Sequence, residues 1–292
     1  MVRFMMTALG IYEKALPPNL SWVEKFELAK KLGFSYIELS IDESDARLDR
    51  LDWDMKTLRE ISDAMDKTDI RIQSLCLSAH RRYPLGSLDA NTRHHALIIL
   101  KKAVKIASML GIRTIQLAGY DVYYEEKSEL TREYFISNLK KCVEIAASKQ
   151  VMLAIEIMDD PFINSITKYN AIKSQIPSPW LQVYPDIGNL SAWPGNDVGQ
   201  ELEQNIAAIA AIHIKDVVKV SPQTTGVFKN VRFGEGDVNF LANFKTLFRI
   251  GYRGSFVLEM WSESDQNPVR SITEALLYIK PILKEAGYVL ES

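Results

Sequence analysis

Four polar residues stand inside apolar runs in the second half of the chain, and their types suit a metal-dependent reaction. They are Glu156 in LAIEIM, Asp186 in VYPDIGN, His213 in AIHIKD and Glu259 in VLEMW. Three buried carboxylates that converge repel one another strongly unless a counter-charge lies between them. A divalent cation supplies that charge. Three carboxylates with one imidazole favour Mn²⁺ or Mg²⁺, although Zn²⁺ or Co²⁺ could occupy the same site.

The two glutamates are also the groups that could transfer protons. A 2-ketose that binds the ion through its carbonyl and a neighbouring hydroxyl acquires an acidic C–H, and the ion stabilises the resulting enediolate. Glu156 and Glu259 could then act from two sides, one removing the proton and the other returning one to the opposite face. Efficient transfer requires both carboxylates to have pKa values near the working pH.

The elements that must position these residues are eight short strands alternating with helices. Apolar residues at helical spacing, such as Trp22, Phe26 and Ala29, separate runs rich in β-branched and aromatic residues. Glycine after the last apolar helical residue, as in KKLGFSYIEL, predicts a helix that returns directly to a strand. The expected strands cover residues 7–12, 36–42, 71–78, 114–119, 151–158, 181–188, 209–216 and 255–261.

Eight such units without a linker predict a single α/β domain over residues 1–292, a (β/α)8 TIM barrel. The four polar residues then lie late in strands five to eight, at the end of the barrel where active sites form. Each of them alone could equally be a polar strand end that is hydrogen-bonded to a loop. The long polar segment 219–236 follows the seventh strand, and loops of this length are usually functional.

Composition excludes several other classes of protein. The 35 Lys and Arg residues nearly balance 37 Asp and Glu, which disfavours a nucleic-acid partner, and the chain has only four histidines, too few for the metal cluster of an apurinic-site endonuclease. The first loop, YEKALPPN, lacks the glycines of a dinucleotide site. No run is long enough to span a membrane, so we expect a cytoplasmic protein whose Cys76 and Cys142 are reduced core thiols.

A series of motifs resembles the L-ribulose-5-phosphate (L-xylulose-5-phosphate) 3-epimerases of the xylose-isomerase-like barrel superfamily, which act in ascorbate and pentose catabolism. The resemblance runs nearly end to end, through LGIYEKALP, CLSAHRRYPLGS, TIQLAGYDVYYEE, IEIMD, YPDIGNLSAW, HIKD, GVFKNVRFGEG and LEMWSE. It implies isomerase-class epimerisation at C3 of a ketopentose 5-phosphate. It also implies that Glu156, Asp186, His213 and Glu259 are the metal ligands, with the two glutamates as the acid/base pair.

The substrate of such an enzyme needs cations for its phosphate and polar groups for its hydroxyls. The expected phosphate contacts are Lys14, Lys215 and Lys229, with Arg81, Arg82 and Lys219 as further candidates, although any single lysine is more often simply solvated. The expected sugar contacts are Glu13, Glu38, His80 and Asn189, with Trp261 as the pocket wall ahead of Trp53 and Trp193. His80 could equally be a structural core histidine. We expect the adjacent His94 and His95 at the surface or in an interface.

Two other readings of the same barrel stay open from the sequence. An aldose–ketose isomerase, such as a hexulose-6-phosphate isomerase, would move hydrogen between C1 and C2, usually with two metal ions. A non-catalytic sugar-phosphate-binding barrel would keep the pocket without needing two opposed glutamates. Barrels of this superfamily often form dimers, so a homodimer is possible, but no feature of the sequence argues for one.

Overall fold

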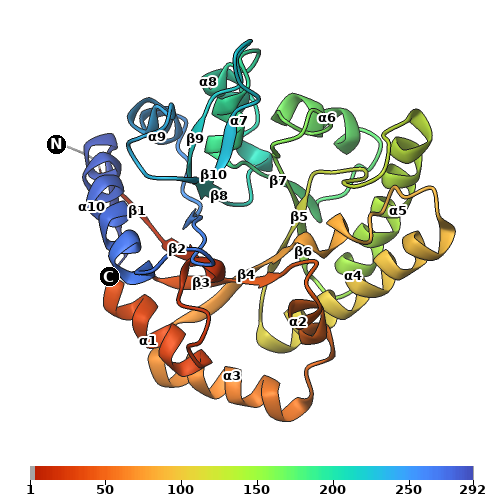
Figure 1. Cartoon of the computed structure of the whole chain (residues 1–292), viewed down its shortest axis with the longest axis horizontal. Coiled ribbons are helices and arrows are strands. Elements are labelled where there is room, and N and C mark those ends of the chain that lie inside the picture. Colours follow the sequence, from red (N-terminus) through yellow and green to blue (C-terminus); the bar gives the residue numbers. More distant parts are fainter. Residues whose placement is uncertain (1–3, 292) are drawn as a thin grey trace.

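Eight parallel strands form a ring at the centre of the molecule in the computed structural model, which describes residues 4–291 (Figure 1). The order is β7-β6-β5-β4-β3-β2-β11-β8, and two isolated bridges among the described residues, Val183 with Ile209 and Asp186 with His213, join β8 to β7. The predicted TIM barrel is therefore confirmed. The strands are β2 Leu9–Tyr12, β3 Tyr36–Ile41, β4 Arg71–Leu77, β5 Thr114–Ala118, β6 Met152–Glu156, β7 Leu181–Tyr184, β8 Ile212–Ile214 and β11 Phe256–Leu258.

Helices surround this ring (Figure 1). Their ends follow local chemistry: Ser21 and Glu24 form a capping box at the start of α1, and Gly33 ends that helix in the left-handed conformation that the sequence predicts there. The helices are α1 Trp22–Leu32, α2 Asp45–Leu48, α3 Met55–Thr68, α4 Ala90–Leu110, α5 Glu129–Ala147, α6 Ile166–Lys173, α7 Ile187–Ala192, α8 Val198–Glu203, α9 Phe240–Arg249 and α10 Pro268–Ala286.

Alternation along each strand separates two environments. In β3, Ile37 and Leu39 belong to the large apolar core between the ring and its helices, whereas Tyr36 belongs to a second cluster that includes Tyr184 and Val257. Successive side chains of a strand point to opposite faces, so Tyr36 and its alternate neighbours face the interior of the barrel. That interior is partly polar, which prepares a site for charged groups at the mouth.

Several strand boundaries differ from the predicted ones. The segment 7–12 is divided between β2 and a separate strand, β1 Met5–Thr7, which pairs in parallel with β12 Tyr288–Leu290 outside the ring. The segment 181–188 ends as a strand at Tyr184, and α7 begins at Ile187 because the Asp186 side chain caps that helix.

The long segment after β8 is a hairpin rather than a simple loop. Its strands are β9 Asp216–Val218 and β10 Val227–Val231, which pair antiparallel. Trp193 supports the hairpin, since its ring centroid lies 5.9 Å from that of Phe228. The hairpin holds Lys229 over the barrel mouth.

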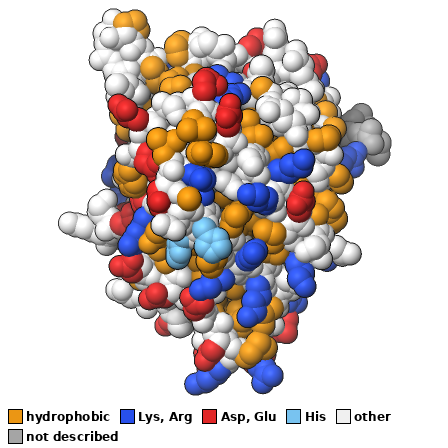
Figure 2. Space-filling view, turned by 90° about the vertical axis from the view of Figure 1, so that its right-hand side faces the viewer, with side chains coloured by type: hydrophobic (Ala, Val, Ile, Leu, Met, Phe, Trp, Pro, Cys, Tyr) orange, Lys and Arg blue, Asp and Glu red, His pale blue; other side chains and the backbone are white. Residues whose placement is uncertain are grey.

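The surface of the molecule is mixed in character, and its two cysteines are internal. The face that carries α4 and α5 mixes acidic, basic and apolar side chains (Figure 2), and His94 and His95 on α4 are exposed. Within residues 4–291, no helix combines the length and the apolar character needed to cross a bilayer. Cys76 and Cys142 are both buried and unpaired, as predicted.

Candidate active site

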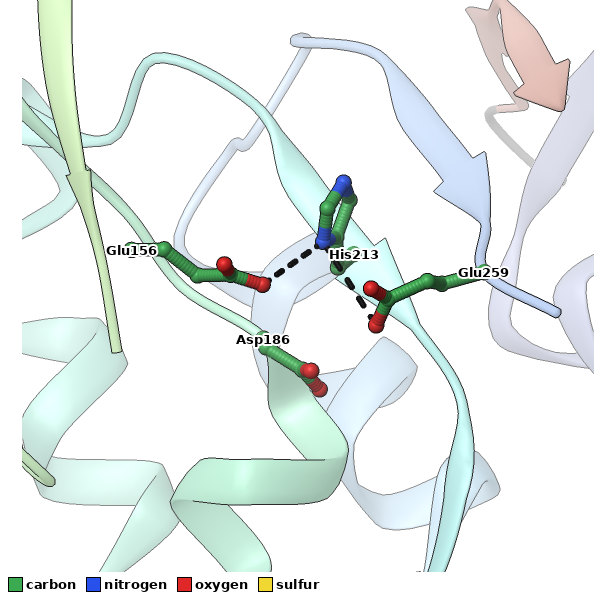
Figure 3. A group of neighbouring side chains, drawn as sticks. All are labelled: Glu156, Asp186, His213 and Glu259. Carbon is green, nitrogen blue, oxygen red and sulfur yellow. Dashed lines mark hydrogen bonds and ion pairs between the residues drawn. The ribbon is translucent and has the colours of Figure 1, made fainter. Parts of the chain in front are cut away.

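The four residues singled out in the sequence converge at the carboxyl ends of their strands. Each of Glu156, Asp186, His213 and Glu259 is buried, and one ligand atom from each lies within 4.8 Å of the others. Glu156 and Glu259 approach His213 from two sides, with Oε1 of Glu156 2.9 Å and Oε2 of Glu259 3.7 Å from Nδ1 (Figure 3). We call these four residues the quartet.

Neighbouring residues hold two members of the quartet, Glu156 and Asp186, in place. Gln116, from β5, donates a hydrogen bond to Oε2 of Glu156. Oδ1 of Asp186 accepts the backbone N–H groups of Gly188 and Asn189 at 2.8 and 3.1 Å, at the start of α7. A cation at a cluster of carboxylates needs such supports, because they fix the directions of the remaining oxygen atoms.

Lys215 provides the positive charge nearest to the carboxylates. Its Nζ lies 2.6 Å from Oδ2 of Asp186 and 3.2 Å from Oε2 of Glu259, and the side chain is 8% exposed. The sequence suggested Lys215 as a phosphate contact, whereas here its ammonium faces two members of the quartet. It compensates part of their charge and leaves a net negative centre.

The environment changes the proton affinities of these carboxylates in different directions. Burial raises the pKa of Glu156, and burial also raises the pKa of Asp186. Burial opposes ionisation of Glu259 as well, but the charges of Lys215 and His213 outweigh it and hold the pKa of Glu259 below its usual range. The two glutamates therefore differ in their tendency to hold a proton.

The donor set fits a hard divalent cation. Three carboxylates and one imidazole with all their ligand atoms within 4.8 Å of one another match the oxygen-rich sets that such ions prefer. Bringing three carboxylates together in a buried site also requires more positive charge than Lys215 carries. The residues present can thus hold one divalent ion.

A narrow pocket opens above the quartet. Its wall combines aromatic and positively charged side chains, and the residues that line it include Lys14, Arg81, Lys215, Lys229 and Trp261. Nζ of Lys229 lies 5.1 Å from the centre of the Trp261 ring, so the hairpin and the end of β11 meet over the pocket. This is the arrangement expected for an anionic group entering next to the quartet.

Arg81 is the more enclosed of the pocket's free cations. Its guanidinium lies 5.5 Å from the ring centre of Tyr120 and 5.2 Å from that of Tyr123, and its buried Nε has no hydrogen-bond partner.

Cys76, interpreted from the sequence only as a core thiol, also lines the pocket. Its place on the interior face of β4, two residues after Ser74, is the signal that would have revealed this.

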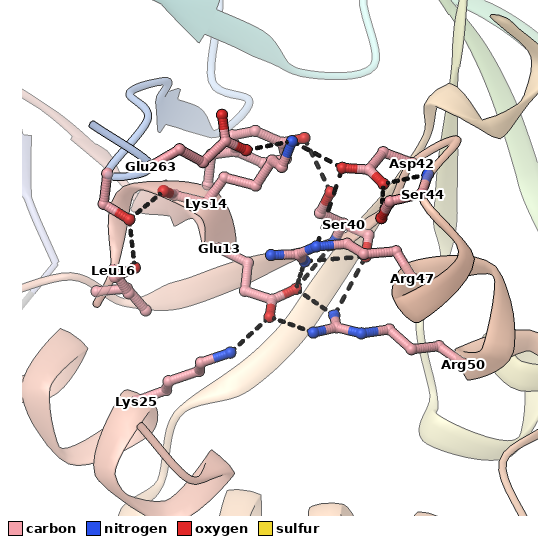
Figure 4. A network of polar contacts seen from close by, with 12 residues as sticks. Glu13, Lys14, Leu16, Lys25, Ser40, Asp42, Ser44, Arg47, Arg50 and Glu263 are labelled. Carbon is pink, nitrogen blue, oxygen red and sulfur yellow. Dashed lines mark hydrogen bonds and ion pairs between the residues drawn. The ribbon is translucent and has the colours of Figure 1, made fainter. Parts of the chain in front are cut away.

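Lys14 is already engaged at the rim. Its Nζ lies 2.7 Å from both Oδ2 of Asp42 and Oε1 of Glu263, so the ammonium links the end of β3 to the segment after β11 (Figure 4). The adjacent Ser262 donates a hydrogen bond to the Lys14 carbonyl. Lys14 therefore borders the pocket and shapes its rim.

Glu13 turns away from the pocket, which revises its predicted role as a sugar contact. Its carboxylate meets Lys25, Arg47 and Arg50 at 2.6 to 3.0 Å and accepts the Ser40 backbone N–H at 3.1 Å (Figure 4). Burial would raise its pKa, but the charges of Arg50, Lys25 and Arg47 lower it from 4.5 to about 2. Glu13 joins β2 to α1 and α2.

Three other expected sugar contacts also have structural partners. Glu38 lies inside the barrel behind His213. His80 is within 3.1 Å of the Ala96 carbonyl through Nε2, and burial lowers its pKa to about 4, as expected for a core histidine. Asn189 donates from its side chain to the Ile157 carbonyl and so ties α7 to the end of β6. In the structure these three side chains are thus engaged by other groups of the protein.

Comparison with known proteins identifies the family of this chain. The family described as "Xylose isomerase-like TIM barrel" matches residues 26–282. L-ribulose-5-phosphate 3-epimerase UlaE of Escherichia coli (strain SMS-3-5) is 50% identical over 96% of each chain. Two solved structures share the fold: D-psicose 3-epimerase from Clostridium cellulolyticum H10, with a TM-score of 0.77 at 16% identity over 94% of this chain and 99% of that one, and an L-ribulose 3-epimerase, with a TM-score of 0.75 at 19% identity over 96% of each. The chain therefore belongs to the xylose isomerase-like TIM-barrel family and, within it, groups with the L-ribulose-5-phosphate 3-epimerases.

Proposed function

We propose that this protein inverts C3 of a ketopentose 5-phosphate, interconverting L-ribulose 5-phosphate and L-xylulose 5-phosphate. The observation that carries the proposal is the placement of Glu156 and Glu259 on two sides of His213, beneath a pocket lined by cations. Two opposed carboxylates are what inversion at one carbon needs, because the proton leaves one face and another arrives at the opposite face. The name of the UlaE relative, which matches nearly the whole chain, supports the same reaction.

The quartet would hold one divalent ion, with Mn²⁺ or Mg²⁺ preferred on the chemistry of the donors and Zn²⁺ or Co²⁺ as other possibilities. When bound, such an ion supplies Lewis acidity that makes the C–H beside the substrate carbonyl easier to ionise. All further steps fall to side chains of this chain.

Glu259 and Glu156 are the proposed proton-transfer groups. Lys215 keeps Glu259 ionised, so this carboxylate suits the removal of a proton, whereas burial favours the protonated form of Glu156. Glu156 then delivers its proton to the other face of C3. For the opposite epimer the two residues exchange roles, as a reversible reaction requires.

The phosphate would lie against Lys229 and Arg81. Both line the pocket, and neither is bound to two carboxylates in the way that Lys14 and Lys215 are. A guanidinium held against two aromatic rings presents fixed N–H donors to a phosphate, which improves binding by pre-ordering the donors. Trp261 would form the wall between the phosphate and the quartet.

Incubation of the protein with a ketopentose phosphate and Mn²⁺ in D₂O tests the reaction. We expect NMR to show deuterium at C3 together with formation of the C3 epimer. Deuterium at C1 with an aldose product would show an aldose–ketose isomerase instead, and no exchange at all would show a binding protein. Either result would overturn the proposal.

Replacement of each glutamate tests the assignment of the two groups. Glu156→Gln and Glu259→Gln should each lower kcat by about 10² to 10⁴, the usual contribution of a positioned acid or base. Glu285→Gln, which changes an exposed glutamate of α10, serves as the matched control and should leave kcat unchanged. Ordinary turnover by either quartet variant, with the fold verified by circular dichroism, would refute the two-base assignment.

A further inference from the structure

We propose that Glu38 is the positioning residue of the centre: it orients His213 and determines which imidazole nitrogen faces the ion. The inference rests on the proposed function, because it concerns the same ion. It replaces the sugar-binding role that the sequence suggested for Glu38 with a role inside the barrel, on the far side of His213 from the pocket.

The contacts of Glu38 are short and come from three other strands. Oε1 lies 2.6 Å from Nε2 of His213, and Oε2 accepts hydrogen bonds from the hydroxyl of Ser74 at 2.6 Å and that of Tyr184 at 2.9 Å. The side chains of both Glu38 and His213 are 0% exposed. The carboxylate thus links β3 and its neighbour β4, across the barrel interior, to β7 and β8, which pair with neither of them.

These contacts assign the proton of the imidazole. A buried carboxylate is costly unless its oxygen atoms receive hydrogen bonds, and Ser74 and Tyr184 serve only Oε2. Oε1 therefore needs the N–H of His213, which puts the ring proton on Nε2. Nδ1 faces Glu156 and Glu259, and there an ion in the quartet would take the place of a proton and meet the Nδ1 lone pair.

Packing holds the ring in the same orientation. The centre of the Tyr184 ring lies 4.8 Å from that of His213 in an edge arrangement, and the Tyr12 ring lies 6.4 Å away. Tyr184 thus contacts both partners, packing on the imidazole and donating its hydroxyl to Glu38. Carboxylates behind ligating histidines raise the basicity of the ligand nitrogen, and their loss typically reduces metal affinity 10- to 100-fold.

Glu38→Gln is the direct test because it keeps the shape and removes the charge. If the amide turns its NH₂ group toward Nε2, the imidazole proton moves to Nδ1 and blocks the ligand position. After removal of bound metal with a chelator, titration with Mn²⁺ by calorimetry should show affinity about 10- to 100-fold weaker than in the wild type. The Co²⁺-loaded variant should also have a changed visible d–d spectrum, which a general loss of stability would not produce.

Two further variants complete the experiment. Ser74→Ala removes one support of Glu38 without touching His213, and should weaken Mn²⁺ binding less than Glu38→Gln does. It keeps the inference testable if the first variant fails to fold. Tyr36→Phe is the matched control, because it removes a buried hydroxyl from the strand that also carries Glu38. This hydroxyl donates to the Phe256 carbonyl and makes no hydrogen bond to the quartet.

The outcomes separate the inference from the proposed function. Wild-type protein that binds Mn²⁺, with Glu38→Gln binding it equally well and giving the same Co²⁺ spectrum, would overturn the positioning role alone. A decrease of the same size in Tyr36→Phe would overturn it too, since it would show a nonspecific effect of the barrel interior. Wild-type protein that binds no divalent ion would overturn the proposed centre and the inference with it.

Discussion

The carboxylate of Asp216 accepts the backbone N–H of Gly236 at 3.0 Å, which fastens the end of the long hairpin segment to its beginning. The same carboxylate also accepts the N–H groups of Val217 and Gly234, both at 2.9 Å. A side chain at position 236 would not fit, because its Cβ would lie 2.2 Å from Oδ1 of Asp216. Asp216 therefore fixes the base of the segment that carries Lys229.

Asp216→Asn should loosen this segment while leaving the barrel intact. The amide replaces one accepting oxygen with an N–H donor that faces backbone N–H groups, so charge-assisted bonds of about 1.5 to 3 kcal/mol are lost. We expect KM for the ketose phosphate to rise about tenfold, the change that 1.4 kcal/mol produces, with kcat nearly unchanged. Steady-state kinetics check this, and an unchanged KM would show that the hairpin does not depend on Asp216.

Lys229→Met should remove the preference of the enzyme for the phosphorylated ketose over the unphosphorylated one. Loss of one ammonium from the pocket is expected to lower kcat/KM for the phosphorylated ketose about 10- to 100-fold, as for a hydrogen bond to a charged group. The unphosphorylated ketose should be affected little. Lys56→Met, which changes an exposed lysine of α3 outside the pocket, is the control. Equal losses on both sugars would assign Lys229 to the fold rather than to the phosphate.

Glu13→Gln should destabilise the protein in a pH-dependent way. The carboxyl pKa is about 2 in the folded protein against 4.5 as its ordinary value, a difference worth about 3 kcal/mol at neutral pH. Because the folded pKa is the lower one, this stability is present above pH 4.5 and is lost as the pH falls toward 2.

Denaturant unfolding at several pH values measures this effect. The wild type and Glu13→Gln should differ most at pH 7 and converge below pH 4.5. Glu60→Gln, which removes an exposed partner of Lys56, should change the free energy of unfolding by about 0.5 kcal/mol or less at any pH. A constant difference between the wild type and Glu13→Gln across the range would contradict the assigned pKa.

His80 should make its own contribution to acid sensitivity. Its pKa is about 4 in the folded protein and 6.5 ordinarily, so the unfolded chain takes up the proton first as the pH falls. Stability is lost between pH 6.5 and 4, by up to about 3 kcal/mol. His80→Gln should flatten the unfolding free energy over this range, whereas an unaltered pH profile would show that the imidazole does not resist protonation.

The barrel and the quartet could be predicted from sequence because both depend on local patterns. Each expected strand has a counterpart in the ring, and polar residues such as Glu156 and His213 stand out among apolar neighbours. Pairing of β1 with β12 could not be foreseen, since two three-residue strands at distant positions leave no periodic signal. The β9–β10 hairpin was missed for a similar reason: β10 is mostly exposed and lacks a buried face.

The sequence predicted the positions of polar residues better than the directions in which their side chains point. Glu13 and Glu38 were expected to contact the sugar because they lie near strand ends, yet one turns toward Arg50 and the other points below the mouth. The alternation of Tyr36, Glu38 and Ser40 within an otherwise apolar strand was the available signal for an interior position. Partners such as Lys25 come from other elements, so they become apparent only in three dimensions.

The junction between β7 and β8 gives the quartet a second significance. Isolated bridges close the ring there among residues 4–291, and one of them pairs Asp186 with His213. An ion shared by these two side chains would cross-link the strands that the backbone joins most sparingly. Depletion of that ion would therefore destabilise the junction between β7 and β8 as well as abolish activity. Local unfolding, and cleavage by proteases, would then begin beside the quartet.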